Sequence, residues 1–142
     1  MRFMVITKAS KESEAGVLPT EQQFQEMWKF NEELVKAGVL LAADGLQPSS
    51  KGARVKFSGT KRTVIDGPFT ETKELVAGYW LFATKSLDEA IEWVKRCPNQ
   101  TGGDCEIEIR QMFDADDFGA ELTPVIEENV ERLRAMAPGT KQ

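Results

Sequence analysis

The chain has 142 residues, the length of one ordinary domain, and 41% of them are hydrophobic and 29% charged. It contains no histidine, which excludes His-dependent nucleophile triads and histidine-ligated zinc, haem or non-haem iron. The net charge of −5 makes nucleic acids and anionic membrane surfaces unfavourable partners. Two cysteines cannot close a zinc site, and the first residues predict neither a signal peptide nor a membrane span. We therefore expect a cytoplasmic protein with no metal and no cofactor.

A strand and a helix are predicted in the first forty residues. The β-prone run 3–7 is followed by a polar surface loop at 8–19, which is long for a compact domain. Thr20, with Gln23 three residues later, predicts a helix start with a capping box. The apolar residues of this helix fit one stripe, in which Asn31 is the polar interruption: Phe24, Met27, Trp28, Leu34 and Val35.

The middle of the chain predicts four further strands and a turn. Gly38 ends the helix, and the apolar run 39–43 that follows predicts a buried strand. Alternating residues at 54–57 and 63–65, separated by a glycine-containing turn, predict a β-hairpin at a sheet edge. The run GYWLFAT at 78–84 has the strongest strand pattern in the chain.

Two helices and one strand are predicted in the last third. Ser86 predicts a helix N-cap, with Glu89 completing a second capping box. The alternating run 106–113 predicts the last strand. After an acidic segment, a third helix is expected over 123–137, with proline in its first turn and Pro138 at its end.

The order β-α-β-hairpin-β-α-β-α predicts an α+β protein. Two βαβ-like halves form a ferredoxin-like βαββαβ sandwich with an antiparallel sheet, an inserted hairpin and an extra C-terminal helix. Helices in this arrangement cover only one face of the sheet. Because the other face needs a partner, we expect a homodimer related by a two-fold axis.

The last strand supplies the first candidate site residues. Glu108 and Arg110 share one face, while the isoleucines of the same strand point to the face that packs on the helices. Either Tyr79 or Trp80 accompanies the two charges, because these neighbours point to opposite faces, and the sequence leaves open which. The alternative is that the charges form an ion-pair ladder on a solvent-exposed edge.

A second group of candidates lies in the run DGPFTETKELVAGY at 66–79. Asp66 opens a turn whose glycine and proline have ordinary turn chemistry, and Phe69 can fill a gap in the core. Glu71 and Lys73 form a charged cluster just before the strongest strand. Taken alone, Asp-Gly-Pro indicates no more than a turn.

Other residues are interpreted as structural. Asp114, Asp116 and Asp117 lack the glycine and terminal glutamate of an EF-hand loop, so we interpret them as a solvated acidic segment. Trp93 lies off the apolar stripe of its helix and is expected at an interface. The two cysteines have no clearly activating neighbour in the sequence.

The chain resembles the DGPF, or YCII-related, protein family. The matching runs are MRFMVI at the start, AGVLLAADGLQP at 37–48, VIDGPFTETKELVAGYWLF at 64–82, LDEAIEWVKRCP at 87–98 and EIEIR at 106–110. The resemblance implies a domain over residues 1–113 with the fold of dimeric α+β barrels. Residues 114–142 would be an acidic linker and a helical extension. Some relatives use a His–Asp pair, which this chain cannot carry.

Two hypotheses of function follow. The first is a cofactor-free, enzyme-like or small-molecule-binding protein, with its cleft between the open sheet face and residues 66–74. Its reaction would be a proton transfer, elimination or isomerisation, with carboxylates as acid and base. The residues expected to act are Asp66 and Glu108 as acid or base, Arg110 and Lys73 on an anionic oxygen, and Glu71, Tyr79 and Trp80 as further ligand contacts. The second is a non-catalytic dimeric binding or accessory regulatory module, in which the same charges fix the turn and the dimer.

Overall fold

A four-stranded antiparallel sheet organises the first of two units. The computed structural model describes residues 1–137, so that Pro138, the expected end of the last helix, lies outside them. The chain divides into the units Met1–Gln111 and Met112–Gln142.

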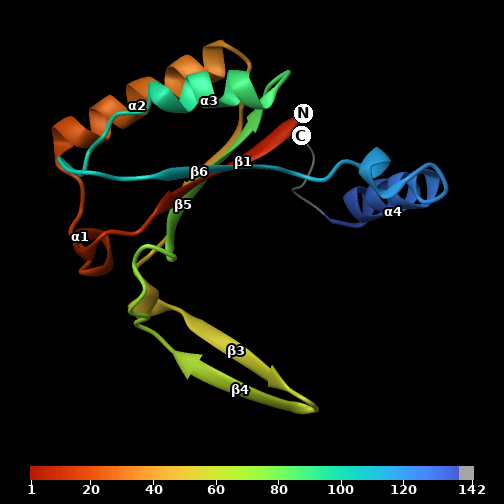
Figure 1. The fold of residues 1–142 in the computed structure, drawn as a ribbon, viewed down its shortest axis with the longest axis horizontal. Coiled ribbons are helices and arrows are strands. Elements are labelled where there is room, and N and C mark those ends of the chain that lie inside the picture. The colour runs from red at the N-terminus through yellow and green to blue at the C-terminus, as the bar shows by residue number, and fades with distance from the viewer. Residues whose placement is uncertain (138–142) are drawn as a thin grey trace. The chain divides into compact units, whose positions relative to one another are not determined.

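The sheet has the strand order β2-β5-β1-β6. Its strands are β1 (Arg2–Lys8), β2 (Leu40–Gly45), β5 (Val76–Ala83) and β6 (Ile107–Gln111), and every neighbouring pair is antiparallel. The first and third strands of the βαββαβ unit therefore lie in the centre, as a ferredoxin-like fold requires (Figure 1). The predicted α+β, ferredoxin-like class is confirmed.

The helices α2 (Glu21–Lys36) and α3 (Leu87–Lys95) lie side by side on one side of this sheet (Figure 1). The capping box at Thr20 is formed: its hydroxyl accepts from the Gln23 backbone N–H, and the Gln23 amide oxygen accepts from the Thr20 N–H. Only half of the second box forms, because Ser86 accepts from the Glu89 N–H but the Glu89 carboxylate turns to the Lys85 N–H.

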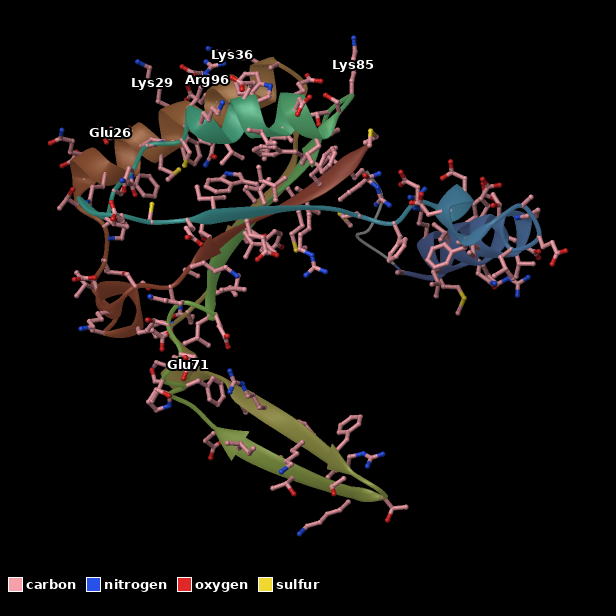
Figure 2. All side chains as sticks on the ribbon, viewed as in Figure 1. Glu26, Lys29, Lys36, Glu71, Lys85 and Arg96 are labelled. Atoms are coloured by element: carbon pink, nitrogen blue, oxygen red, sulfur yellow. The ribbon has the colours of Figure 1, made fainter. Side chains whose placement is uncertain are left out.

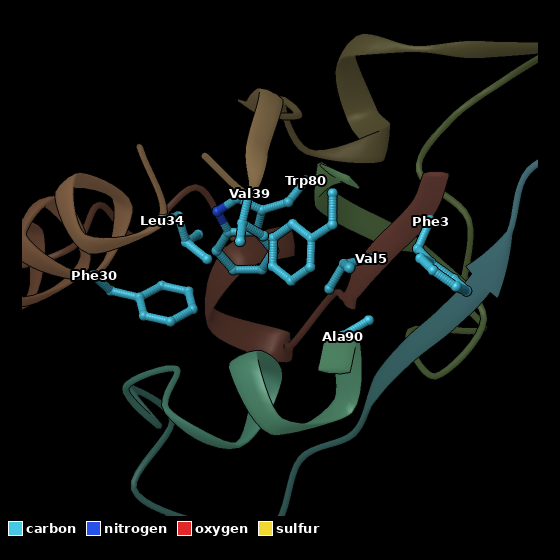
Figure 3. Close-up of a cluster of buried hydrophobic side chains, with 8 residues drawn as sticks. Phe3, Val5, Phe30, Leu34, Val39, Trp80 and Ala90 are labelled. Carbon is cyan, nitrogen blue, oxygen red and sulfur yellow. The ribbon is translucent and has the colours of Figure 1, made fainter. Parts of the chain in front are cut away.

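Eight buried hydrophobic residues form the core between the sheet and the two helices (Figure 3). They are Phe3, Val5, Phe30, Leu34, Val39, Trp80, Phe82 and Ala90. Ile107 and Ile109 pack against them, as the alternation of β6 predicts. Trp93 is half-buried and packs there too, with its ring under the Arg96 guanidinium, 4.3 Å from the ring centre. Its expected place at an interface stays a prediction.

The buried side of α2 differs from the predicted stripe. Phe30 and Leu34 are buried, whereas Phe24 and Trp28 are each 55% exposed and Val35 is 62% exposed. The two apolar rows overlap along the helix, and hydrophobicity alone does not separate them. The row that contains Phe30 and Leu34 packs against the sheet. Phe24 and Trp28 lie on the outer side of the helix, where their rings stack with centres 6.1 Å apart.

The polar segment 8–19 is not a plain loop. It contains the short helix α1 (Lys11–Glu14), which Ser10 and Ser13 cap reciprocally. A helix of four residues is too short to show an apolar period, and this is why the sequence pattern misses it.

The predicted hairpin forms as a sheet of its own. It consists of β3 (Ala53–Ser58) and β4 (Lys61–Asp66), joined at Gly59 with φ of 58°, and it follows the 3-10 turn η1 (Ser49–Lys51). Neither strand is hydrogen-bonded into the four-stranded sheet, so the expected place at a sheet edge was wrong. Every residue of both strands is exposed.

The second unit contains η2 (Ala115–Phe118) and α4 (Thr123–Met136). The rings of Phe113 and Phe118 lie 5.0 Å apart, and the Thr123 hydroxyl donates to the Gly119 carbonyl at 2.8 Å. Proline stands in the first turn of α4, as predicted. Throughout residues 1–137, each helix is too short or too polar to span a lipid bilayer.

Candidate functional site

The strand register decides which face of the sheet each candidate residue occupies. Val5 lies opposite both Trp80 and Ile109, so these three share the face covered by α2 and α3. Ile6 lies opposite both Tyr79 and Glu108, so these share the other, open face. Of the two aromatic residues that the sequence left as alternatives, Tyr79 is therefore the one beside the charges.

The open face carries a small ion-pair network on its β6 side. The Glu108 carboxylate lies 3.3 Å from Lys8 Nζ and 3.7 Å from Arg110 Nε. The side chains of Lys8 and Glu108 are 26% and 41% exposed, whereas that of Arg110 is 75% exposed. Both charges predicted on β6 thus have partners, and each pair is open enough to be worth little to stability.

Tyr79 and Glu108 lie too far apart to act on the same atom of a ligand. Across the sheet the register runs Asp44, Tyr79, Ile6, Glu108. Two strand spacings separate Tyr79 from Glu108, which is about 10 Å between the chains. Asp44 is the immediate neighbour of Tyr79, and the tyrosine hydroxyl donates to Asp44 Oδ2 at 3.4 Å.

The three candidates of the DGPF region lie at the hairpin rather than beside Tyr79. Asp66 is the exposed last residue of β4, paired with Ala53. Glu71 and Lys73 are exposed in the turns that lead to β5, and Figure 2 shows Glu71 at the base of the hairpin. The structure therefore brings Glu108 together with Arg110, but it separates both from Asp66, Glu71 and Lys73.

The DGPF segment builds the base of the hairpin. A Cβ atom on Gly67 would lie 1.8 Å from the carbonyl oxygen of Ser49, so a glycine is needed there. The Phe69 N–H donates to the Ser49 hydroxyl at 2.9 Å, and that hydroxyl and the Ser49 N–H both donate to the carboxylate of Glu14. The Arg54 guanidinium of β3 lies 3.7 Å above the centre of the Phe69 ring. The motif thus ties the hairpin to η1 and α1.

A cleft of about 650 Å³ opens elsewhere in the first unit. It lies where the segment that contains α1 and the start of α2 meet the ends of β2 and β5. Both Tyr79 and Trp80 line it. The remaining lining residues are Thr7, Ser10, Glu12, Ser13, Val17, Leu18, Pro19, Gln23, Met27, Asn31, Ala43, Asp44, Gly45, Ala77, Gly78, Gln100 and Thr101.

A partly buried hydrogen bond holds the inner part of the cleft. Trp80 is 6% exposed, its indole N–H donates to the Asn31 amide oxygen at 2.8 Å, and the Phe30 ring meets it edge-on at 5.9 Å. This contact explains the polar interruption of the α2 stripe. Because an amide side chain also carries two N–H donors, Asn31 can donate to a bound molecule without releasing Trp80.

One wall of the cleft is made by two glutamines. The Gln23 amide donates to the Gln100 carbonyl at 3.2 Å, and the Gln100 amide donates back to the Gln23 carbonyl. Gln23 also closes the capping box of α2, so one residue fixes the helix start and joins it to the loop after α3. The wall therefore depends on the helix cap.

The charged side chains that line the cleft are all of one sign. Among the lining residues, all of which lie in the described part of the chain, the charged ones are Glu12 and Asp44, and both are acidic. The other polar groups are hydroxyls and amides. Such a lining repels carboxylates and phosphates and accepts hydrogen bonds from neutral or cationic donors.

The lining of the cleft contains neither thiol, and the acidic cluster belongs to the second unit. Burial, together with the smaller effect of the nearby Cys105, raises the pKa of the Cys97 thiol to about 11, so Cys97 stays protonated at neutral pH. The carboxylates of Asp114, Asp116 and Asp117 come within 4.8 Å of one another. The Asp117 carboxylate accepts from the Asp114 N–H at 2.7 Å and so serves the local turn.

Asp44 is the residue that sequence reasoning missed. It follows the apolar run of β2 and precedes a glycine, which is an ordinary turn pattern. Its place beside Tyr79 comes from strand pairing between residues 35 positions apart. The DG dipeptide at 44–45, at the end of the run predicted as a buried strand, was the one indication in the sequence. In the structure β2 includes this dipeptide, and its residues are half-buried or exposed, because β2 is an edge strand.

Comparisons with known proteins bear on the first unit. The family model described as YCII-related domain matches residues 1–113. An uncharacterized protein of Rhizobium meliloti (strain 1021) is 30% identical over 92 residues, which cover 65% of this chain and 74% of that protein. Among solved structures, 5-chloro-2-hydroxyhydroquinone dehydrochlorinase from Burkholderia phenoliruptrix AC1100, in complex with 2,5-dihydroxybenzoquinone, aligns with a TM-score of 0.44 and 14% identity. That alignment covers 80% of this chain and 94% of that one.

Proposed function

We propose that this chain, which belongs to the family of YCII-related domains, binds a small polar molecule, neutral or cationic, in the cleft beside Asp44 and Tyr79. The observation that carries the proposal is the lining itself: a volume of about 650 Å³ with Trp80 at its inner end, a hydrogen-bonding wall and acidic charges only. Clefts of this size hold small ligands.

The proposed chemistry is acid–base catalysis by the Asp44–Tyr79 pair. The Asp44 carboxylate accepts a hydrogen bond from a hydroxyl or ammonium group of the ligand. As general base it takes a proton from one atom of the ligand and returns it at another, or releases it to water when a leaving group departs. The phenol of Tyr79 donates a hydrogen bond to the Asp44 carboxylate at 3.4 Å. This hydrogen bond stabilises the negative charge of the carboxylate before the proton is transferred. A carboxylate and a phenol supply proton transfer, so the reaction class is an isomerisation, an elimination or a related proton transfer.

The earlier assignment of Asp66 and Glu108 as acid and base, with Arg110, Lys73, Glu71 and Trp80 on the ligand, stays a prediction. Of these residues Trp80 lines the cleft. The alternative function, a non-catalytic dimeric binding or regulatory module, is supported by the network of Lys8, Glu108 and Arg110, whose members satisfy one another.

We also propose that the protein is a cytoplasmic homodimer, in which the open sheet face packs on the same face of a second copy. Met4, Ile6 and Leu81 line this face and are half-buried in the single chain. The two free thiols support a reducing compartment.

A thermal-shift screen tests the proposed ligand class. Neutral phenols and polyols, primary amines, carboxylates and phosphates are compared on the wild-type protein. A ligand at about 100 times its Kd adds about 2.7 kcal/mol to the free energy of unfolding. We expect stabilisation by a neutral or cationic class, and a Kd raised about tenfold or more by Asp44→Asn, which removes a charged acceptor.

Matched variants make the screen decisive. Asp104→Asn removes an exposed carboxylate that does not line the cleft and should leave the Kd unchanged. Stabilisation by anions alone, or equal affinity in Asp44→Asn, would contradict the proposal. Loss of binding in Asp66→Asn or Glu108→Gln, with Asp44→Asn unaffected, would support the earlier assignment instead.

A further inference from the structure

We propose that the β3–β4 hairpin is an arm that docks on a second copy of this chain through the apolar face formed by Val55, Phe57 and Val64. The inference rests on the proposed homodimer and adds to it a contact surface that lies outside the four-stranded sheet.

The apolar face is defined by the hairpin register. Val55 pairs with Val64, and Phe57 pairs with Arg62, so their side chains lie on one side of the two-stranded ribbon. Val55, Phe57 and Val64 are 56%, 70% and 66% exposed. Three neighbouring large apolar side chains with this exposure form a patch of the kind that marks a contact with another protein.

A hairpin with such a composition does not stand alone in water. An isolated two-stranded ribbon is marginally stable, and it needs either a third strand or a packed face. Here neither strand joins the four-stranded sheet. The opposite side of the ribbon carries one large apolar residue, Ile65, among polar and charged ones that include Arg54 and Lys56. The side with Val55, Phe57 and Val64 is therefore the more apolar of the two and is the one that lacks a cover.

The arm is held in shape before any partner binds. At its tip the Arg62 guanidinium lies 4.2 Å above the Phe57 ring and donates to the carbonyls of Gly59 and Lys61. At its base the network of Glu14, Ser49 and Phe69 ties it to the rest of the unit. A preformed arm loses less conformational entropy when it docks, which raises its affinity.

Charge indicates a second copy of this chain as the occupant. Segment 51–66 carries five of the 18 basic residues and one of the 23 acidic ones, so its charge is +4 and that of the remaining chain is −9. The positive charge of the arm is therefore complementary to the negative charge of the rest of an identical molecule. The electrostatic attraction between them speeds the association of the two copies. A nucleic acid would contact the basic residues but would leave the apolar face exposed to water. The net charge of −5 also makes nucleic acid binding unfavourable.

Sedimentation velocity at protein concentrations up to about 100 µM tests the arm. We expect the triple variant Val55→Thr, Phe57→Thr, Val64→Thr to raise the dimer Kd about tenfold or more, because it removes an apolar anchor and keeps strand-forming residues. Ile65→Thr, on the other side of the ribbon, is the matched control and should leave the Kd unchanged. Salt should weaken the wild-type dimer.

Zero-length cross-linking of wild-type protein avoids any question of misfolded variants. In an equal mixture of ¹⁴N- and ¹⁵N-labelled protein, we expect mixed-isotope links from Lys56 and Lys61 to carboxylates of the other copy. A wild-type monomer overturns both the homodimer and the arm. A dimer weakened by a charge on the open sheet face but not by the triple variant overturns the arm alone. Hairpin-dependent binding of an oligonucleotide by a monomer overturns both and assigns the hairpin to nucleic acid.

Discussion

Gly67 shows what the DGPF segment requires at the level of one residue. Its missing Cβ makes room for the Ser49 carbonyl, a backbone atom that cannot rotate away as a flexible side chain can. We expect Gly67→Ala to weaken the hairpin base by about 1–3 kcal/mol, because the added methyl group forces the two segments apart. Hydrogen exchange measured by mass spectrometry should show faster exchange of the β3 and β4 amides, with the core strands unchanged.

Gly103→Ala is the control for this change. A Cβ atom at Gly103 meets no other group within 4 Å, so the same substitution should leave exchange unaltered. Equal exchange rates in Gly67→Ala and the wild type would show that the hairpin base tolerates the displacement, and the account of the motif as an anchor would be wrong.

For some residues of the candidate site, the sequence alone was enough to predict which other residues share their face of the sheet. Alternation along β6 predicts that Glu108 and Arg110 share a face, because the side-chain period of a strand is two. The same rule gives Tyr79 and Trp80 opposite faces, but register with β1 is needed to decide which one joins Glu108. Asp44 could not be predicted, since its role depends on pairing between distant strands.

At the level of elements, α2, α3 and α4 were predicted from the sequence, whereas α1 was missed and the buried side of α2 was predicted wrongly. The caps of α2 and α3 follow from short local patterns, which need no tertiary information. The buried row of α2 needs the sheet, because Phe24 and Trp28 on the outside are as apolar as Phe30 and Leu34 inside. The hairpin was predicted from its alternation, while its separation from the main sheet depends on the turns at its base.

The full capping box of α2 and the half box of α3 are expected to differ in the coupling free energy between their two capping residues. In α2 the Thr20 and Gln23 side chains satisfy each other's backbone, so Thr20→Ala should lower the free energy of unfolding by about 1 kcal/mol. The double-mutant cycle with Gln23→Ala should give a coupling of about 0.5 kcal/mol or more. Urea unfolding of the four proteins measures it.

The cycle of Ser86→Ala with Glu89→Ala is the control for this coupling. Glu89 donates its backbone N–H to Ser86, but its carboxylate accepts from the Lys85 N–H, so the two hydrogen bonds do not join the same two residues as those of Thr20 and Gln23 do. We expect near additivity in α3. Equal coupling energies in the two helices would contradict this difference between the caps.

For the whole first unit, the main consequence of the fold is that two helices cover one side of a four-stranded sheet. The element order was enough to predict this asymmetry, because βαβ connections of one hand place their helices on the same side. The face left over is apolar at its centre and carries charged or polar side chains at both margins. A face of this kind suits a closed two-fold contact, in which each copy covers the other.

Leu81→Glu tests that contact directly. Leu81 lies on the open face, opposite Met4 and Ala42, so the substitution leaves the core residues of its own unit untouched. In a dimer it would bury an unpaired carboxylate on each copy. That costs several kcal/mol, so we expect the dimer Kd measured by sedimentation to rise about a hundredfold or more. Leu87→Glu, at a position of α3 that is 45% exposed, adds the same charge outside the face and should leave the Kd unchanged. If both variants dimerise as tightly as the wild type, the open face is not the contact, and another surface must hold the two copies together.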